Sequence, residues 1–520
     1  MYLFDNGVIH TLDPAHPTVE AVLVDDSGQI AQVGKAVDLA TATVKHVDLG
    51  GRTLIPGLND AHVHIWKLGL LLTVQIDARG LPDIPAITDR FRERTGQSPA
   101  GTWLTGRGYN EADLTEHRHL TRADLDAAST EHPIALTRTC GHMIVANSRA
   151  LELAGINAST PNPPGGVIVR DEHGEPTGLL QETAMGLLNV PLPDDATMAR
   201  AIRAAMDHQL RLGITSATDP LLTPDHLRVY RQLEADHLLT VRVNGLPIRR
   251  PDAAVKITYP LPEKYLSPTL RIDTVKFFAD GGLSGATAAI SEPYKITGDQ
   301  GVLRFETDEL IELMWEAHDA GYRIGTHAIG DVALDQVISV YELLNERKPG
   351  LRHRIEHLGL PNLEHLRRLK AINAIAVPQT VFLPALGTAF RRYLPDDYFE
   401  RCYPVRAMLD EGLTVALSSD APVVPDDNPL LGMKAALDRL DGHGDPIAPA
   451  QSINAFEALH AYTMGGAIAS GDQDNRGSIT PGKWADLVIL SGDPLNTPPE
   501  VLLDLHVDQT YVGGQLVYER

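Results

Sequence analysis

The amino-acid sequence predicts an α/β protein whose main body is a (β/α)₈ barrel of the TIM type. Three observations indicate this fold class. Strand-like and helix-like segments alternate through the middle of the chain, strand-like segments occur at both ends, and one early connection is far longer than the others. We therefore expect a barrel over residues 56–477 that carries an α+β insertion at about 76–190. Residues 1–55 and 478–520 are expected to form one small composite β-sandwich domain.

Both ends of the chain show the alternating apolar pattern and the glycine-bearing turns of short β-strands. Near the N-terminus these segments are 7–12, 21–24 and 30–34, and near the C-terminus they are 485–490 and 509–518. Isolated strands of this kind are unstable. We therefore expect the two ends of the chain to pair with each other.

The middle of the chain repeats a helix followed by a strand. A typical unit has Met198, Ile202, Met206 and Leu210 at helical spacing, then Gly213 where the helix ends. The expected strands are the opening segment with His62 and His64, then 214–218, 240–245, 271–278, 323–327, 352–357, 374–377 and 413–419. Eight such units predict a closed barrel. A doubly wound open sheet is the alternative, and the lack of Gly-x-Gly-x-x-Gly after the first strand disfavours it.

The long connection follows the first strand. About 130 residues separate His64 from the helix that begins near residue 196, far more than a βα loop normally uses. Segments 103–110, 133–138 and 165–170 suggest a small α+β element. Because it leaves from the rim that carries the active site in such barrels, we expect it to cover the site and to shape what enters.

Composition narrows the classes of partner and compartment. A net charge of −23 would repel nucleic acid and anionic membrane surfaces, so neither is an expected partner. No apolar run approaches the ~20 residues of a membrane span, and residues 1–6 lack the pattern of a secretory signal. The two cysteines, Cys140 and Cys402, give no disulfide framework. We expect a cytoplasmic protein.

Two histidines one residue apart open the barrel, at His62 and His64. In an extended strand alternate side chains point to the same side, so both rings could hold one ion. More polar residues fall at the ends of later strands, where an active site is expected. They are Lys276, His327, His357 and Asp420.

These residue types suit a divalent metal centre, because imidazole and carboxylate are ligands of zinc and similar ions. Four histidines and Asp420 exceed the needs of one tetrahedral site, and they suffice for two ions if a further group bridges them. An ammonium group at Lys276 would be repelled by two cations, whereas a lysine carboxylated by carbon dioxide would offer two bridging oxygens. Taken singly, each residue could instead be a helix cap or a core side chain.

The motif Pro56-Gly-x-x-Asp-x-His-x-His64, together with the lysine, histidines and aspartate above, resembles the amidohydrolase superfamily. Further segments are similar to its branch of N-substituted formamide deformylases and YtcJ-like hydrolases. They are Trp103-x-x-Gly-Arg-Gly-Tyr109, Gly141-His142, Val275-Lys-Phe-Phe-Ala-Asp-Gly281 and Pro481-Gly-Lys-x-Ala-Asp486. One departure is Gly282, where relatives often have serine.

The resemblance implies two divalent ions bridged by carboxylated Lys276. Zinc is the first choice, with manganese, iron or nickel as alternatives. His62, His64 and Asp420 would hold the deeper ion, and His327 and His357 the outer one. Asp420 would also move the proton while a metal-activated hydroxide attacks the substrate.

The expected substrate is a small linear amide, an N-formyl or N-acyl amine. Hydrolysis of a cyclic amide, carbamate or ester, or deamination, is the alternative on the same site. A non-catalytic scaffold is disfavoured because all six candidate ligands are present. A homodimer is left open. The expected substrate contacts are Tyr109, Arg138, His142 and Gln379.

Overall fold

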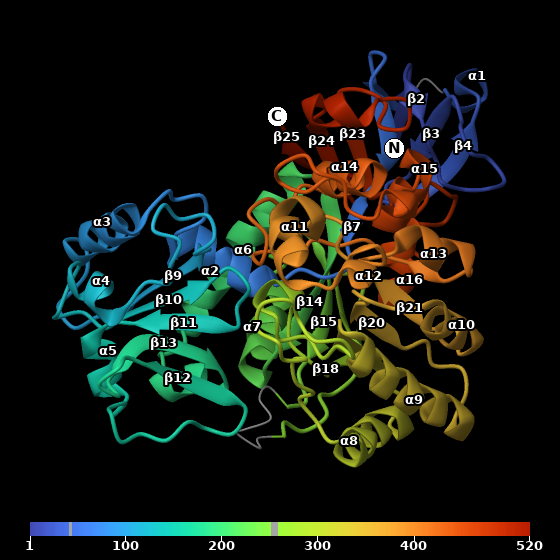
Figure 1. Ribbon diagram of the computed structural model, residues 1–520. Coiled ribbons are helices and arrows are strands. Elements are labelled where there is room, and N and C mark those ends of the chain that lie inside the picture. Colours follow the sequence, from blue (N-terminus) through green and yellow to red (C-terminus); the bar gives the residue numbers. More distant parts are fainter. Residues whose placement is uncertain (41–43, 251–257) are drawn as a thin grey trace.

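The computed structural model describes residues 1–40, 44–250 and 258–520. A barrel of strands and helices occupies the middle, and the insertion lies on one side of it (Figure 1). The strands of the two chain ends lie together on another side. Among the described residues, no helix combines the length and the apolar character needed to cross a membrane.

In the described part of the chain, parallel strands form the barrel in two hydrogen-bonded runs. The first run is β7 (Leu58–Asp60), β14 (Ile214–Leu222), β15 (Arg242–Pro247) and β17 (Leu270–Ile272). The second is β18 (Thr274–Phe278), β19 (Arg323–Ala328), β20 (Arg354–His357), β21 (Ile375–Val377) and β22 (Thr414–Val415). A β-bridge between Ile248 and Lys276 joins the runs at one seam. At the other seam Asp420 N donates to His62 O (2.7 Å), so the runs make up the predicted barrel.

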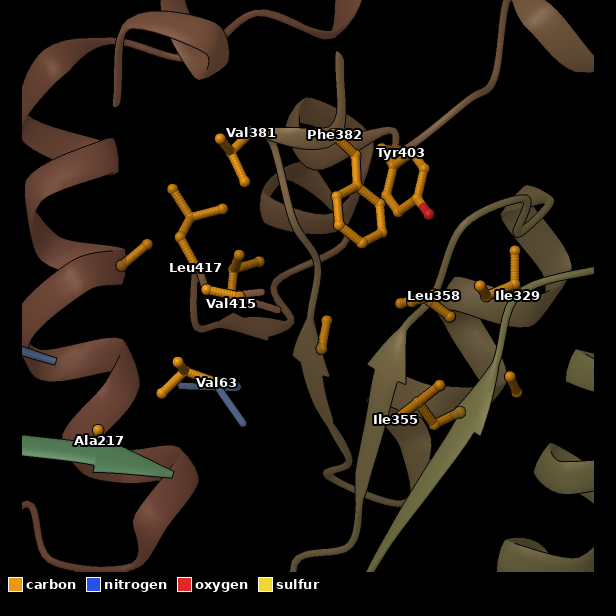
Figure 2. Packing of buried hydrophobic residues seen from close by; sticks show 14 of the residues in the cluster. Val63, Ala217, Ile329, Ile355, Leu358, Val381, Phe382, Tyr403, Val415 and Leu417 are labelled. Carbon is orange, nitrogen blue, oxygen red and sulfur yellow. The ribbon is translucent and has the colours of Figure 1, made fainter. Parts of the chain in front are cut away.

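Helices cover the outer side of these strands, so strands such as β15, β19 and β20 are buried along their whole length. The helices are α6 (Asp195–Arg211), α7 (Pro224–Ala235), α8 (Thr307–Asp319), α9 (Asp331–Arg347), α10 (Leu363–Ala371) and α13 (Val405–Asp410). Thr223 and Asn362 cap α7 and α10 by accepting from backbone N–H groups three residues on. Figure 2 shows part of the buried cluster, with Val63 from the segment after β7, Ala217 from β14 and Ile355 from β20.

The insertion is an α+β element with its own cores. Its six-stranded sheet has the order β12, β13, β11, β10, β9, β8. The strands are β8 (Ile76–Asp77), β9 (Leu104–Tyr109), β10 (Ile134–Arg138), β11 (Met143–Ala146), β12 (Gly166–Arg170) and β13 (Pro176–Glu182). The helices are α3 (Ile84–Thr95), α4 (Arg122–Asp126) and α5 (Ser148–Leu153).

Strands from the two chain ends share one sheet, in the order β2, β6, β23, β24, β25. These strands are β2 (Val8–Ile9), β6 (Thr53–Pro56), β23 (Leu487–Leu490), β24 (Val507–Val512) and β25 (Gln515–Glu519). β6 runs antiparallel to β23, with Leu54 opposite Ile489. A second sheet contains β1 (Tyr2–Asp5), β3 (Ala21–Val24), β4 (Ile30–Gly34) and β5 (Lys45–Asp48). Phe4 of the second sheet packs edge-on against Tyr511 of the first.

Two barrel strands differ from the sequence prediction. The strand expected over 271–278 is divided at Asp273, whose carboxylate binds Arg271 and Arg323. The first half, β17, pairs with β15 of the first run, and the second half, β18, pairs with β19 of the second run. The division therefore lets this segment contribute one strand to each run. The strand expected over 413–419 keeps regular pairing only at β22, because the chain then turns toward the site.

Candidate metal centre

The sequence predicted His62 and His64 within the first barrel strand, but both lie beyond its end. β7 ends at Asp60, and His64 directly precedes helix α2 (Ile65–Thr73). The two rings stand at 90° to each other, with centroids 5.6 Å apart. Their Nε2 atoms nevertheless converge, at 3.5 Å and 3.2 Å from Asp420 Oδ1. The two rings therefore converge as expected, but they do so through a turn of the chain and not through alternation along a strand.

Asp60 links this turn to the segment that carries Asp420. Its carboxylate accepts hydrogen bonds from His62 N (3.1 Å), Ser419 N (3.1 Å) and Ser419 Oγ (2.5 Å). Asp420 follows directly, with φ 59°, and His357 has φ 73°. Such left-handed backbone is uncommon for these residue types and is typical of functional sites. The aspartate of the opening motif therefore positions the candidate ligands around it.

Two of the histidine rings are oriented through their Nδ1 atoms. His62 Nδ1 donates to Glu356 Oε2 (2.5 Å), and Arg354 holds the same carboxylate. His357 Nδ1 donates to Gln379 Oε1 (2.7 Å), since the amide nitrogen of Gln379 donates elsewhere. Each neutral ring then keeps its lone pair on Nε2. This is the arrangement that a metal-binding imidazole requires.

Burial keeps these imidazoles neutral. It lowers the pKa of His62, His64 and His327 well below the ordinary value and lowers the pKa of His357 to about 3. A histidine must be deprotonated to bind a metal, so the rings are in the right state. Donor atoms of His62, His357 and Asp420 lie within 4.8 Å of one another.

Two buried polar atoms at the centre have no hydrogen-bond partner among the described residues. They are Lys276 Nζ and Asp420 Oδ1. Lys276 is fully buried, and burial lowers the pKa of its amine to about 8. Leaving such groups unsatisfied costs about 1–3 kcal/mol each or more. A buried amine with a lowered pKa, which is more readily uncharged than an ordinary lysine, and a free carboxylate oxygen both fit a metal centre bridged by a carboxylated lysine.

His327 is held by a different contact. Its Nε2 donates to Gly281 O (2.9 Å), which leaves the lone pair on Nδ1. The ring lies against His357, with centroids 4.4 Å apart. Fully buried Asp280 lies 3.4 Å from His327 Nε2 and accepts from the backbone N–H groups of Ile329 and Gly330. His327 therefore belongs to the same cluster, in the orientation fixed by this loop.

A cavity of about 230 Å³ opens onto these residues. The barrel contributes His62, His64, His327, His357 and Asp420 to its wall. The insertion and the segment after it contribute Arg107, Cys140, His142, Glu182 and Met185. Part of the wall thus comes from the insertion, as its place in the sequence predicted.

A smaller apolar cavity of about 50 Å³ adjoins the first and shares His357 and Asp420 with it. Phe382 and Tyr403 line it, with ring centroids 5.8 Å apart (Figure 2). Gly282 also lines it, and a Cβ added there would meet nothing within 4 Å. Glycine in place of serine therefore enlarges this apolar space.

Comparison with known proteins identifies the family. The model of the amidohydrolase family matches residues 45–518. The chain belongs to the amidohydrolase family. It is 31% identical to the YtcJ protein of Bacillus subtilis, over 100% of this chain and 99% of that protein. It is 30% identical to an N-substituted formamide deformylase of Arthrobacter pascens, over 99% of this chain and 98% of that protein.

Solved structures agree with this assignment. An uncharacterized metal-dependent hydrolase from Pyrococcus horikoshii superposes with a TM-score of 0.78 at 26% identity, over 96% of this chain and 99% of that one. The predicted superfamily and barrel fold are therefore confirmed. So is the predicted class of enzyme, a metal-dependent hydrolase that acts on carbon–nitrogen bonds.

Of the four substrate contacts predicted for this amidohydrolase, the structure brings only His142 to the cavity. Tyr109 lies in the core of the insertion, where its hydroxyl meets His119 Nδ1 (3.1 Å). Arg138 pairs with Glu111 (2.7 Å) and faces a separate cavity of about 770 Å³. Gln379 is fully buried behind His357. The structure therefore places these three residues outside the lining of the cavity at the candidate metal centre.

Several cavity residues were missed in the sequence. Arg304 pairs with Glu182 (3.0 Å), which also contacts His142 Nδ1 (3.1 Å). Nothing local in the sequence marks this cluster, since its members come from distant segments. Arg107 and Lys67 also line the cavity. A signal existed for both, because Arg107 lies inside the motif that ends at Tyr109 and Lys67 lies one helical turn after His64.

Proposed function

We propose that this amidohydrolase cleaves a linear amide, with N-formyl or N-acyl amines as the substrate class. The observation that carries the proposal is the convergence of His62, His357 and Asp420 on a cavity with an apolar extension, together with the amine of Lys276, which has no hydrogen-bond partner among the described residues. The similarity to a formamide deformylase over nearly the full chain supports it. The apolar extension suits a hydrocarbon group on either side of the amide.

Two divalent ions, zinc in the first instance, would be held by six side chains. His62, His64 and Asp420 would hold one ion and His327 and His357 the other. Carboxylated Lys276 would bridge them. Its buried amine, with its pKa lowered to about 8, supports this role, because only an uncharged amine combines with carbon dioxide.

The side chains of the site then have distinct roles in the reaction. Bound divalent ions supply a Lewis acid for the carbonyl oxygen and lower the pKa of water from ~15.7 toward ~7. Asp420, whose Oδ1 is free of hydrogen bonds and lines the cavity, accepts the proton of the attacking water and returns it to the leaving nitrogen. Glu356 and Gln379 hold the rings of His62 and His357 in place.

A substrate screen with metal analysis on the same preparation tests the proposal. N-formyl and N-acyl amines are compared with cyclic amides, carbamates, esters and amino heterocycles. We expect turnover of the linear amides and two ions per chain by elemental analysis. Turnover of the other classes alone, or one ion per chain in fully loaded enzyme, would contradict the proposal.

Lys276→Ala tests the bridge. We expect loss of metal and activity, with partial recovery of both in the presence of short carboxylic acids, which can occupy the bridging position. Lys35→Ala, at an exposed lysine ahead of helix α1 (Ala36–Leu39), is the control and retains both. Detection of a free amine at position 276 by mass analysis of fully active enzyme would rule out the carbamate.

A further inference from the structure

The cavity above the candidate metal centre contains two cationic side chains that lack an acidic partner. Lys67 projects from helix α2 and Arg107 from strand β9, and both line the cavity. Among the described residues, neither forms an ion pair within 4.0 Å. Arg107 is 7% exposed, its Nε has no hydrogen-bond partner among the described residues, and its Nη2 makes only a long contact to Thr139 O (3.5 Å).

The other cations near this wall are neutralised. Arg304 pairs with Glu182 (3.0 Å), and Arg79 pairs with Asp77 (2.7 Å). Among the described cations that line this cavity, Lys67 and Arg107 are the two without an ion pair, whereas Lys276, which also lacks a partner, is buried at the metal centre and does not line the cavity. Burial lowers the pKa of Lys67 to about 7 and the charge of Arg107 acts in the same direction, while the carboxylates of Asp420 and Asp219 act in the opposite direction. Two partly desolvated cations that face one cavity are stabilised when a further anion binds between them.

We propose that Lys67 and Arg107 bind a carboxylate group carried by the substrate. The substrate class is then an N-acyl or N-formyl compound with a carboxylate close to the scissile amide, of which N-acyl amino acids are the simplest. The inference rests on the proposed function, because the cations line the same cavity as Asp420. Arginine suits this task, since its planar guanidinium presents donors that match a carboxylate.

Paired substrates measure the preference directly. N-acyl amino acids are compared with the corresponding N-acyl amino acid amides, which have the same shape without the charge. A charge-assisted hydrogen bond is worth roughly ten- to hundredfold in affinity. We expect the wild-type enzyme to favour the acids by ~10–100-fold in kcat/KM, mainly through KM. Lys67→Met and Arg107→Gln should each reduce this ratio by about tenfold, with little change for the amides.

Lys35→Met and Arg90→Gln are the matched controls, because both are exposed and Arg90 lies in the same insertion as Arg107. They should keep the wild-type ratio. Equal kcat/KM for acid and amide in the wild type, or an unchanged ratio in both cavity variants, would overturn the proposal. A loss confined to kcat would assign these residues a merely structural role and would overturn it as well.

A binding experiment separates failure of this inference from failure of the proposed function. 4-Oxopentanoate copies N-acetylglycine with a methylene in place of the amide nitrogen, so it is not hydrolysed, and 4-oxopentanamide is its neutral match. Calorimetry on the metal-loaded enzyme should show tighter binding of the acid by roughly tenfold or more, lost in Lys67→Met. If no amide is turned over, this result still supports the carboxylate site. Equal binding of acid and amide, or wild-type binding by both variants, shows that no such site exists.

Discussion

At the scale of single residues, the candidate ligands depend on neighbours that the sequence does not reveal. Gln379 was predicted to contact substrate because it follows the seventh strand, yet its amide oxygen accepts from His357 Nδ1 at 2.7 Å. Glu356 serves His62 in the same way. The residue types at the strand ends were predictable, since a barrel gathers its strand ends at one mouth. The direction of each ring was not, because it is set by a hydrogen bond between distant segments.

Replacing Gln379 should weaken metal binding without unfolding the chain. Gln379→Met keeps the volume and removes the acceptor of His357 Nδ1, and the loss of such a partner typically lowers metal affinity by ~10–100-fold. Competition with a chelator measures the affinity. Gln336→Met, at a buried glutamine of α9 that bonds Phe305 O, is the control and should leave it unchanged. Equal affinities in the two variants would show that Gln379 does not orient the ring.

Asp420→Asn should separate metal binding from proton transfer. Asparagine keeps a ligand oxygen but accepts no proton, and one acid/base group is typically worth ~10²–10⁴ in rate. We expect the variant to retain much of its metal and to lose turnover by about that factor. Metal content and kcat are measured on the same sample. Near-normal kcat in the metal-loaded variant would assign the proton transfer to another group, with His142 the next to test.

At the scale of elements, the order of strands and helices followed from local periodicity, whereas the contact between insertion and barrel did not. β13 of the insertion ends at Glu182, which has φ 50° and pairs with Arg304 from the segment after β18. These residues are far apart in the sequence, and neither lies in a recognisable motif. Periodicity indicates which face of an element is buried. It carries no information on which polar pair links the insertion to the barrel.

The Glu182 pair gives a pH dependence of stability. Burial alone would raise the pKa of this carboxyl, but His142 and Arg304 outweigh it and hold the pKa at about 2, against 4.5 for an ordinary glutamate. A depressed pKa stabilises the folded state above pH 4.5, and the contribution is lost as the pH falls toward 2. The difference in unfolding free energy between wild type and Glu182→Gln should therefore be largest near neutral pH and shrink below 4.5.

Urea unfolding at a series of pH values measures this difference. Glu312→Gln, at an exposed glutamate of helix α8, is the control and should differ from the wild type by the same small amount throughout. A difference for Glu182→Gln that does not change between neutral pH and pH 3 would show that the charge of this carboxyl does not hold the insertion on the barrel.

At the scale of the whole molecule, the two chain ends meet the barrel at Asp486. The alternating apolar pattern predicted strands at both chain ends, and these strands were expected to pair because isolated strands are unstable. The sequence marked Asp486 only as the last residue of the motif Pro481-Gly-Lys-x-Ala-Asp486. In the structure Asp486 accepts from Arg242 of β15 (2.6 Å and 2.9 Å) and from Gly513 N (2.8 Å), and its carbonyl accepts from Gly57 N (2.8 Å). One residue, through its side chain and its backbone carbonyl, thus connects the barrel, the segment after the N-terminal strand β6 and the C-terminal hairpin.

This junction should decide whether the molecule unfolds as one unit. The side chains of Arg242 and Asp486 are each only 4% exposed, so Asp486→Asn leaves a buried cation unpaired, which typically costs about 3–5 kcal/mol. Asp319→Asn breaks an exposed pair with Arg347 and should cost about 0–1 kcal/mol.

Replacing both partners, by Arg242→Met with Asp486→Leu, should cost less than the two single changes added together, because neither charge is then left alone. Urea denaturation followed by tryptophan fluorescence, with Trp484 stacked on Arg242 as a local probe, measures the single variants and the double variant. Additive costs in the double variant, or a transition of Trp484 separate from the rest in the wild type, would show that the chain ends fold independently of the barrel.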